Sequence, residues 1–344
     1  MLELGSIVIH AHISDSKYAA NKFRIWVLEK MFDGLRKISF WWNVSPKYCA
    51  NKIIHKFFEE CRVNTPLSVC RALQKEVYSW LESLYSKELA EWEELSETAV
   101  IDGGFSGLPI WFCWLQGSDD MPELQRQLME RIRRQAGKHP VRFVDIDELK
   151  RLDIIPKYAF EAFESGRIRP ALFSDLVRVS LLDEFGGIWV DSSIFAARPI
   201  PDWCGQFVFL SPKGLNPYPY ERYVPFGNEW QSYFLCSYPH ALFVHLMREM
   251  ILEYIKKEYP VIDYFLVFYF AKLLRSKIPV IFDEYKELPD NNEDCELLHL
   301  SLCDSNEECI RKKSYFSKSN TFIYKLNRRI SYDPDILRLV DEWF

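Results

Sequence analysis

The stretch from residue 173 to residue 193, FSDLVRVSLLDEFGGIWVDSS, decides the fold. Its first part carries apolar residues at helical spacing, which predicts a mostly buried helix that ends at Phe185. Asp175 and Arg178 lie three residues apart in this helix, so they share one of its faces. A double glycine then ends the helix, because glycine adopts the left-handed conformation that such an end needs.

A buried strand follows the double glycine and ends in an acid. Ile188, Trp189 and Val190 predict the strand, and Asp191 lies at its carboxyl end. In open α/β sheets, ligands bind in the crevice beyond the carboxyl ends of the strands. An acid there, beside the charged pair of the preceding helix, predicts a site for a charged ligand.

Residues 108–146 predict a βαβ unit. The apolar runs 108–115 (LPIWFCWL) and 141–146 predict two buried strands, and Glu123–Ala136 predicts the helix between them. Strand, helix and strand within about forty residues imply a parallel sheet. We therefore expect an α/β protein with a Rossmann-type, mostly parallel sheet.

The rest of the chain predicts a helical extension and several smaller elements. Residues 1–105 predict helices, so we expect an N-terminal helical extension before an α/β domain over residues 106–344. Later in the chain, Pro279–Phe282 predicts a last strand, and the polar, charged stretch Asp290–Lys313 predicts a surface insertion.

The helix predicted over Asn21–Trp42 is basic and rich in aromatic residues. A helix of this composition can lie in a membrane interface. The simpler interpretation is a helix docked on the rest of the protein with its lysines in solvent. Both interpretations stay open at this point.

Composition bounds the class of protein. The chain has 344 residues, of which 48% are hydrophobic, so it can bury a sizeable core. A net charge of −6 gives no indication of general nucleic-acid binding. Nine scattered cysteines, no C-x-x-C and no secretory signal predict reduced thiols in a cytoplasmic protein. No apolar run approaches the roughly 20 residues of a membrane span.

The charged residues of the opening stretch suit a nucleotide sugar as ligand. Asp175 offers a carboxylate for sugar hydroxyls, Arg178 a guanidinium for phosphate or sugar oxygens, and Asp191 a carboxylate for a divalent cation. Such a cation, Mg²⁺ or Mn²⁺, would stabilise a leaving nucleoside diphosphate. Taken separately, the helix pair also fits a structural ion pair, and an acid at a strand end is common.

Two further parts of the chain are candidates for ligand contacts. Core packing is the default for the aromatic residues of a parallel sheet, which include Trp111. Trp114 or the loop after it lies nearest the carboxyl end of its strand and could stack on a base. Lys325 belongs to a late polar cluster and could face a diphosphate, although a solvated surface lysine is the simpler interpretation.

The central stretch resembles a known signature. SDLVRVSLLDEFGGIWVDSS resembles the S-D-x-x-R-x-x-L-L-x-x-x-G-G-x-W-x-D pattern of bacterial capsular polysaccharide synthesis proteins, which are DXD-type glycosyltransferases related to glycosyltransferase family 32. WFCWLQG at 111–117, IDYFL at 262–266 and TFIYKLN at 321–327 resemble further segments of that family. The resemblance covers about residues 108–327, and the first hundred residues match nothing.

The resemblance implies a GT-A fold and a hexosyltransferase. Its donor would be a nucleoside-diphosphate sugar, its acceptor a glycan or lipid-linked glycan of a capsular or surface polysaccharide, and its expected stereochemistry retention. It implies catalytic roles for Asp175, Arg178 and Asp191, and a Mn²⁺ or Mg²⁺ ion on Asp191 and Ser193. The implied donor-binding residues are Trp111, Trp114, Gln116, Asp175, Arg178, Trp189, Asp191, Ser192, Ser193 and Lys325.

Two positions depart from the family pattern. Ser193 stands where the D-x-D motif has its second acid, and Tyr324 stands where the late motif commonly has His. These departures motivate an alternative from another class, a non-catalytic sugar-nucleotide-binding or scaffold subunit of a polysaccharide assembly. For either function we expect a cytoplasmic protein, with peripheral attachment to the inner membrane face through the N-terminal helices as the open question.

Overall fold

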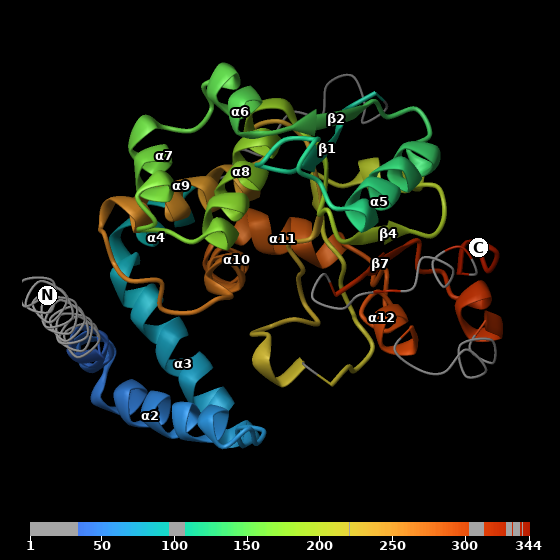
Figure 1. Ribbon diagram of the computed structural model, residues 1–344. Coiled ribbons are helices and arrows are strands. Elements are labelled where there is room, and N and C mark those ends of the chain that lie inside the picture. The colour runs from blue at the N-terminus through green and yellow to red at the C-terminus, as the bar shows by residue number, and fades with distance from the viewer. Residues whose placement is uncertain are drawn as a thin grey trace, which may run out of the picture. The chain divides into compact units, whose positions relative to one another are not determined.

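The computed structural model describes residues 34–95, 107–219, 221–302, 313–327, 332, 338 and 340–344. The chain divides into two compact units, Met1–Trp80 and Leu81–Phe344. Figure 1 labels most of their elements. The strands are β1 (Ile110–Cys113), β2 (Val141–Val144), β3 (Gly187–Val190), β4 (Ile194–Ala196), β5 (Phe209–Leu210), β6 (Phe234–Ser237) and β7 (Ile323–Lys325). The helices are α2 (Pro46–Glu60), α3 (Leu67–Leu84), α4 (Ser86–Glu93), α5 (Glu123–Gln135), α6 (Ile146–Leu152), α7 (Lys157–Glu164), α8 (Pro170–Phe185), α9 (Leu242–Lys256), α10 (Leu266–Lys277), α11 (Pro279–Glu287) and α12 (Leu298–Ser301).

The first unit is helical in its described part, as the sequence predicts. A helix over residues 34–44 precedes α2, and α3 follows. Ser45 caps α2, because its Oγ accepts a hydrogen bond from the amide of Tyr48 at 2.9 Å and donates one to Glu76 at 2.7 Å. Residues 21–33 of the predicted Asn21–Trp42 helix lie outside the described residues. No described helix is both long and apolar enough to cross a membrane.

The boundary between the units differs from the one expected near residue 105. The second unit begins at Leu81 and includes α4. Tyr85, which precedes α4, is fully buried, donates a hydrogen bond to the carbonyl of Met250 at 2.9 Å and packs edge-on against Phe270 at 5.5 Å. This aromatic side chain therefore anchors the start of α4 to α9 and α10 within the second unit.

The second unit is built on a five-stranded sheet with the order β2-β1-β3-β6-β5. β1 pairs in parallel with β2 and β3, so that Ile110 lies opposite both Val141 and Ile188. β6 runs antiparallel to β3 and to β5. β5 therefore runs in the direction of β3, and the mostly parallel α/β sheet expected from the sequence is confirmed.

Four helices, α8 to α11, pack in succession beside this sheet. Helix α8 packs on β3 and β6, α9 packs on α8, α10 on α9, and α11 on α10. Figure 1 labels these four helices. Helix α8 is buried along most of its length, because its apolar residues surround the helix rather than forming one stripe. Arg178 and Asp183 are thereby held inside the protein, Asp175 is half-buried, and Glu184 near the end of the helix is exposed.

Two expectations from the sequence are wrong. Residues Pro279–Glu287 form helix α11 rather than a strand, because Pro279 suits the first helical turn. Phe282 is exposed while Ile281 is buried, which is the pattern of a surface helix. Residues 291–302, predicted as part of a surface insertion, are largely buried instead: Asn292 Oδ1 accepts hydrogen bonds from the β7 segment, and Cys295 is fully buried.

A second, smaller sheet lies beyond the carboxyl end of β3. β4 begins after a turn at Ser192 and Ser193, and it pairs antiparallel with β7. The register places Ile194 opposite Lys325. The sequence predicted neither strand, since each is three residues long.

The double glycine fixes the junction between α8 and β3. Gly186 has φ +64° and Gly187 has φ +111°, conformations that residues with a side chain rarely adopt. A Cβ atom on Gly187 would overlap the carbonyl oxygen of Pro109, which accepts a hydrogen bond from the amide of Ile188 at 2.8 Å. Glycine is therefore required here by space as well as by backbone conformation.

We expect Gly187→Ala to lower the free energy of unfolding by about 3 kcal/mol or more, because the backbone of β1 or β3 must shift. Gly117→Ala is the matched control. Gly117 also has a positive φ, +89°, but no atom lies within 4 Å of its Cβ position, so only about 1 kcal/mol of backbone strain is expected. Urea unfolding measures both, and equal losses would contradict the steric argument.

Candidate functional site

Helix α8 and strand β3 deliver three charged groups to one place. Asp175 and Arg178 lie one turn apart on α8, and Asp191 follows β3 directly. The Arg178 guanidinium forms an ion pair with Asp175 and donates from Nη2 to Asp191 Oδ1 at 2.9 Å. Its side chain is only 5% exposed. The structure thus brings together the three charged residues that the sequence analysis grouped, and their role as a ligand site stays a prediction.

Asp191 accepts from three donors. Besides Arg178, Trp189 Nε1 donates to Asp191 Oδ1 at 2.8 Å, and Lys325 Nζ donates to Asp191 Oδ2 at 2.9 Å. The backbone amide of Asp191 donates to the carbonyl of Tyr233 at 2.9 Å. Both carboxylate oxygens are thus engaged, and the orientation of the carboxylate is fixed from three directions.

The two acids of this site differ in pKa. Burial raises the pKa of the Asp175 carboxyl to about 6, although Arg178 opposes the shift. Burial acts in the same direction on Asp191, but the charges of Lys325 and Arg178 outweigh it and lower the pKa to about 2. Near neutral pH, Asp191 is therefore fully ionised and Asp175 is mostly ionised.

The small sheet brings Lys325 to the site. β7 pairs with β4, and hydrogen bonds on both sides of Lys325 hold its backbone: its amide donates to Cys295 O, and the amide of Leu326 donates to Ser193 O, each at 2.8 Å. The Lys325 ammonium lies 5.1 Å from the ring centroid of Tyr233. Several predicted donor-binding residues lie far from the central stretch in the sequence. Among the described residues, Lys325 is the one of these that contacts Asp191.

Sequence reasoning missed a buried group of residues around Lys325. Tyr233 forms a hydrogen bond with Cys295 Sγ at 2.8 Å, and burial raises the pKa of both groups well above the usual values. Burial also raises the pKa of Glu296, while Lys325 opposes that shift. Glu296 belongs to the stretch predicted as a surface insertion. The charged composition of that stretch did not indicate that Glu296 lies near Lys325.

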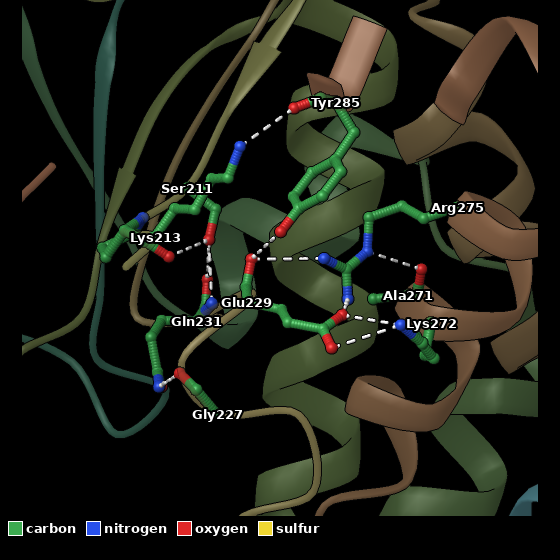
Figure 2. A network of polar contacts seen from close by, with 10 residues as sticks. Ser211, Lys213, Gly227, Glu229, Gln231, Ala271, Lys272, Arg275 and Tyr285 are labelled. Atoms are coloured by element: carbon green, nitrogen blue, oxygen red, sulfur yellow. Dashed lines mark hydrogen bonds and ion pairs between the residues drawn. The ribbon is translucent and has the colours of Figure 1, made fainter. Parts of the chain in front are cut away.

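A polar network around Glu229 and Gln231 holds the segment that precedes β6 (Figure 2). The Glu229 carboxylate accepts from Lys272 Nζ at 2.9 and 3.2 Å, and its carbonyl oxygen accepts from Arg275 Nη1 at 3.2 Å and from Tyr285 Oη at 3.1 Å. Ser211 Oγ then accepts from the amide of Gln231 and donates to its carbonyl. These contacts hold the backbone just before Tyr233 in place.

The other predicted donor-binding residues, on and after β1, do not all lie near Asp191. Trp111 is buried and donates from Nε1 to the carbonyl of Gly186 at 2.8 Å, so its indole lies at the start of β3 and not with Asp191. Trp114 follows β1 at its carboxyl end, and its buried Nε1 has no partner among the described residues. Gln116 is exposed in the next loop.

Ser192 and Ser193 form the turn between Asp191 and β4. Ser192 is half-buried and Ser193 is buried. The carbonyl of Ser193 accepts from Leu326, as described above. The two serines therefore have a structural role in joining β3 to the small sheet, whatever their hydroxyls bind.

Tyr324 faces away from the site. Adjacent residues of a strand point to opposite sides, so Tyr324 and Lys325 cannot both face Asp191. The Tyr324 ring packs in a buried apolar cluster, 5.6 Å from the ring of Phe316 and 5.4 Å from that of Phe344. The replacement of His by Tyr at this position therefore removes no group from the surroundings of Asp191.

The donor set around Asp191 does not fit a divalent cation in this geometry. Such a cation binds oxygen ligands, and at Asp191 Oδ2 it would lie beside the Lys325 ammonium, which is 2.9 Å from that oxygen. Ser193 supplies a hydroxyl in place of a second acid. Across the described ranges, no three His, Cys, Asp or Glu residues gather so that they could hold a metal ion. The Mn²⁺ or Mg²⁺ ion expected from the sequence stays a prediction.

The family model for "Capsular polysaccharide synthesis protein" matches residues 53–336, which include the whole site. The chain belongs to this capsular polysaccharide synthesis protein family. The match begins within α2, so the family extends further toward the N-terminus than the motifs around residues 108–327 indicate. A relation to glycosyltransferase family 32 is not part of this match.

Comparison with solved structures gives a distant likeness to the PaToxG glycosyltransferase. The two share 11% sequence identity with a TM-score of 0.37, over 62% of this chain and 81% of that chain. No curated protein matches the chain.

We expect Asp191→Asn to lower the free energy of unfolding by about 2 kcal/mol at pH 7, and by less as the pH falls from 4 toward 2. The folded-state pKa of Asp191, about 2, lies below that of an unfolded chain. The stabilisation is therefore present above the unfolded pKa and is lost as the pH falls through the folded one. Urea unfolding of both proteins at several pH values measures it; a loss that does not vary with pH would contradict the ion-pair assignment.

Proposed function

We propose that the chain is a glycosyltransferase. It transfers a hexose from a nucleoside-diphosphate sugar to a glycan or lipid-linked acceptor during capsular or surface polysaccharide synthesis. The observation that carries this proposal is the cluster of Asp175, Arg178, Asp191 and Lys325 beyond the carboxyl end of β3, in a chain of the capsular polysaccharide synthesis family. Open α/β sheets bind their ligands at this edge.

The charges of the cluster suit the chemistry of sugar transfer. The bond between the anomeric carbon and the diphosphate oxygen breaks, its electron pair stays on that oxygen, and the acceptor hydroxyl loses its proton as the new bond forms. Negative charge thus develops on the leaving diphosphate. Arg178 and Lys325 are cations fixed in place, so they stabilise this charge without reorganisation. Positioning supplies the rest of the rate, and no covalent nucleophile is assigned.

The remaining groups suit the sugar and the base. Asp175 is mostly ionised near neutral pH and accepts hydrogen bonds from sugar hydroxyls. Trp114 Nε1 and Arg178 Nε are buried N–H groups without a partner among the described residues. Unpartnered buried donors are costly, and a bound donor substrate satisfies them. Retention of configuration stays a prediction.

A non-catalytic sugar-nucleotide-binding or scaffold subunit is the second candidate. It is favoured by Ser193 in place of an acid and by the engagement of both Asp191 oxygens. Calorimetry with a panel of nucleoside diphosphates, followed by a donor-hydrolysis assay, separates the two functions. Binding without hydrolysis of any donor sugar supports the second candidate and contradicts the first.

We also propose that the first unit attaches to the membrane surface, close to a lipid-linked acceptor. The helix over residues 34–44 exposes Leu35, Ile38 and Trp42, which share one face, and Arg36 and Lys37 stand between them in the sequence. Apolar residues flanked by basic ones are typical of helices that lie in an anionic lipid interface.

We expect Asp191→Ala to lower donor hydrolysis and transfer by about a hundredfold or more, because the variant loses the group that holds Arg178 and Lys325 in place. The assay uses a panel of nucleoside-diphosphate sugars, and circular dichroism confirms that the variant is folded. Asp183→Asn is the control, since Asp183 is a buried acid of the same helix that pairs with His245 instead. Wild-type turnover in Asp191→Ala would contradict the assignment.

We expect the protein to float with vesicles that contain anionic lipid and not with neutral vesicles. The double variant Leu35→Ser, Trp42→Ser should lose about tenfold or more in vesicle affinity, because two large apolar side chains no longer enter the interface. Phe282→Ser, which removes an exposed aromatic side chain from α11, is the control and should float normally. No flotation of the wild type with anionic vesicles would exclude the surface attachment.

A further inference from the structure

Lys325 lies where a divalent cation would have to bind. Its ammonium is 2.9 Å from Asp191 Oδ2, while Asp191 Oδ1 is taken by Arg178 and Trp189. A carboxylate oxygen offers about two lone-pair positions, so a cation that coordinates Asp191 would bind Oδ2 directly beside the Lys325 ammonium. Lys325 is the donor on the oxygen that accepts from one group alone, so a metal ion and this ammonium compete for the same atom.

The protein holds Lys325 in this position from several sides. The backbone bonds to Cys295 and from Leu326 fix its strand, and its side chain is only 25% exposed. The Tyr233 ring lies beside the ammonium. A lysine on a surface loop could change its rotamer when a metal ion binds. Lys325 would lose an ion pair, an aromatic contact and its partly buried position by doing so.

Two fixed cations already face the acids of the site. The carboxylates Asp175 and Asp191 face the cations Arg178 and Lys325, and Glu296, whose pKa burial raises, also lies near Lys325. A divalent ion would add two positive charges within a few ångströms of both cations, and repulsion at that distance in a buried site is strong. A diphosphate, in contrast, brings negative charge to two fixed cations.

We infer that Lys325 takes the place of the divalent cation at Asp191, so that the donor diphosphate binds to Arg178 and Lys325 without Mn²⁺ or Mg²⁺. The part of this inference that concerns the diphosphate rests on the proposed function. The part that concerns exclusion of the metal ion from Asp191 does not, and it is tested separately.

The first experiment is a titration of the nucleotide-free protein with Mn²⁺, followed by electron paramagnetic resonance. The wild type should leave the signal of free Mn²⁺ unchanged. Lys325→Met should bind one ion, because Asp191 Oδ2 is then available, and adding Asp191→Asn should abolish that binding. Lys325→Arg keeps a cation and should exclude Mn²⁺.

Lys213→Met is the matched control, since Lys213 is also half-buried and lies over a tyrosine ring, that of Tyr285 at 4.4 Å. It should bind no Mn²⁺. Binding of Mn²⁺ by the wild type that Asp191→Asn removes would overturn the inference, and this measurement does not depend on the folding of any Lys325 variant.

The second experiment is calorimetry with uridine, guanosine and cytidine diphosphates, in EDTA and in Mn²⁺. The wild type should bind its preferred diphosphate with the same affinity in both. Lys325→Met should lose about tenfold or more in EDTA, and Mn²⁺ should restore the loss. Loss of wild-type binding in EDTA would overturn the inference. If no diphosphate binds while the Mn²⁺ titrations give the expected results, the proposed function is contradicted. The exclusion of the metal ion from Asp191 is then still supported.

Discussion

The carboxylate of Asp191 is the interaction on which the site depends. It joins α8 through Arg178, its own strand through Trp189, and the late strand β7 through Lys325. Arg178 and Trp189 are near Asp191 in the sequence, whereas Lys325 is 134 residues away, so the ionised acid is one of the contacts that join the large and small sheets. An acid in this position is stabilised by its partners rather than by water, which is why its pKa lies so far below its usual value.

This arrangement requires that helix α8 and strand β3 meet at a fixed angle. The two glycines make that possible, because Gly187 approaches the backbone at Pro109 more closely than any residue with a Cβ could. Trp111 was expected to contact the donor. Its indole donates to the carbonyl of Gly186 and so packs against the junction between α8 and β3. The glycines and Trp111 thus act on the site indirectly, by fixing the direction from which α8 delivers Asp175 and Arg178.

The local part of this structure could be predicted, and the nonlocal part could not. Helix α8, strand β3 and the acid at its end follow from apolar spacing and glycine chemistry within about twenty residues. The pairing of β4 with β7 joins residues more than a hundred positions apart, and strands of three residues carry no periodic signal. Asn292 and Cys295 are buried because they satisfy backbone groups of the β7 segment, although the composition around them is that of a surface loop.

The register of β7 also decides how the late motif should be interpreted. A one-residue shift would turn Tyr324 toward Asp191 and Lys325 into the apolar cluster, which would bury an ammonium without a partner. The observed register avoids that cost, because Tyr324 fills the cluster and Lys325 meets the acid. The residue of this strand that contacts Asp191 is therefore the lysine. The side chain at position 324 packs behind the strand, so the charge beside Asp191 comes from Lys325 and does not depend on whether position 324 is tyrosine or histidine.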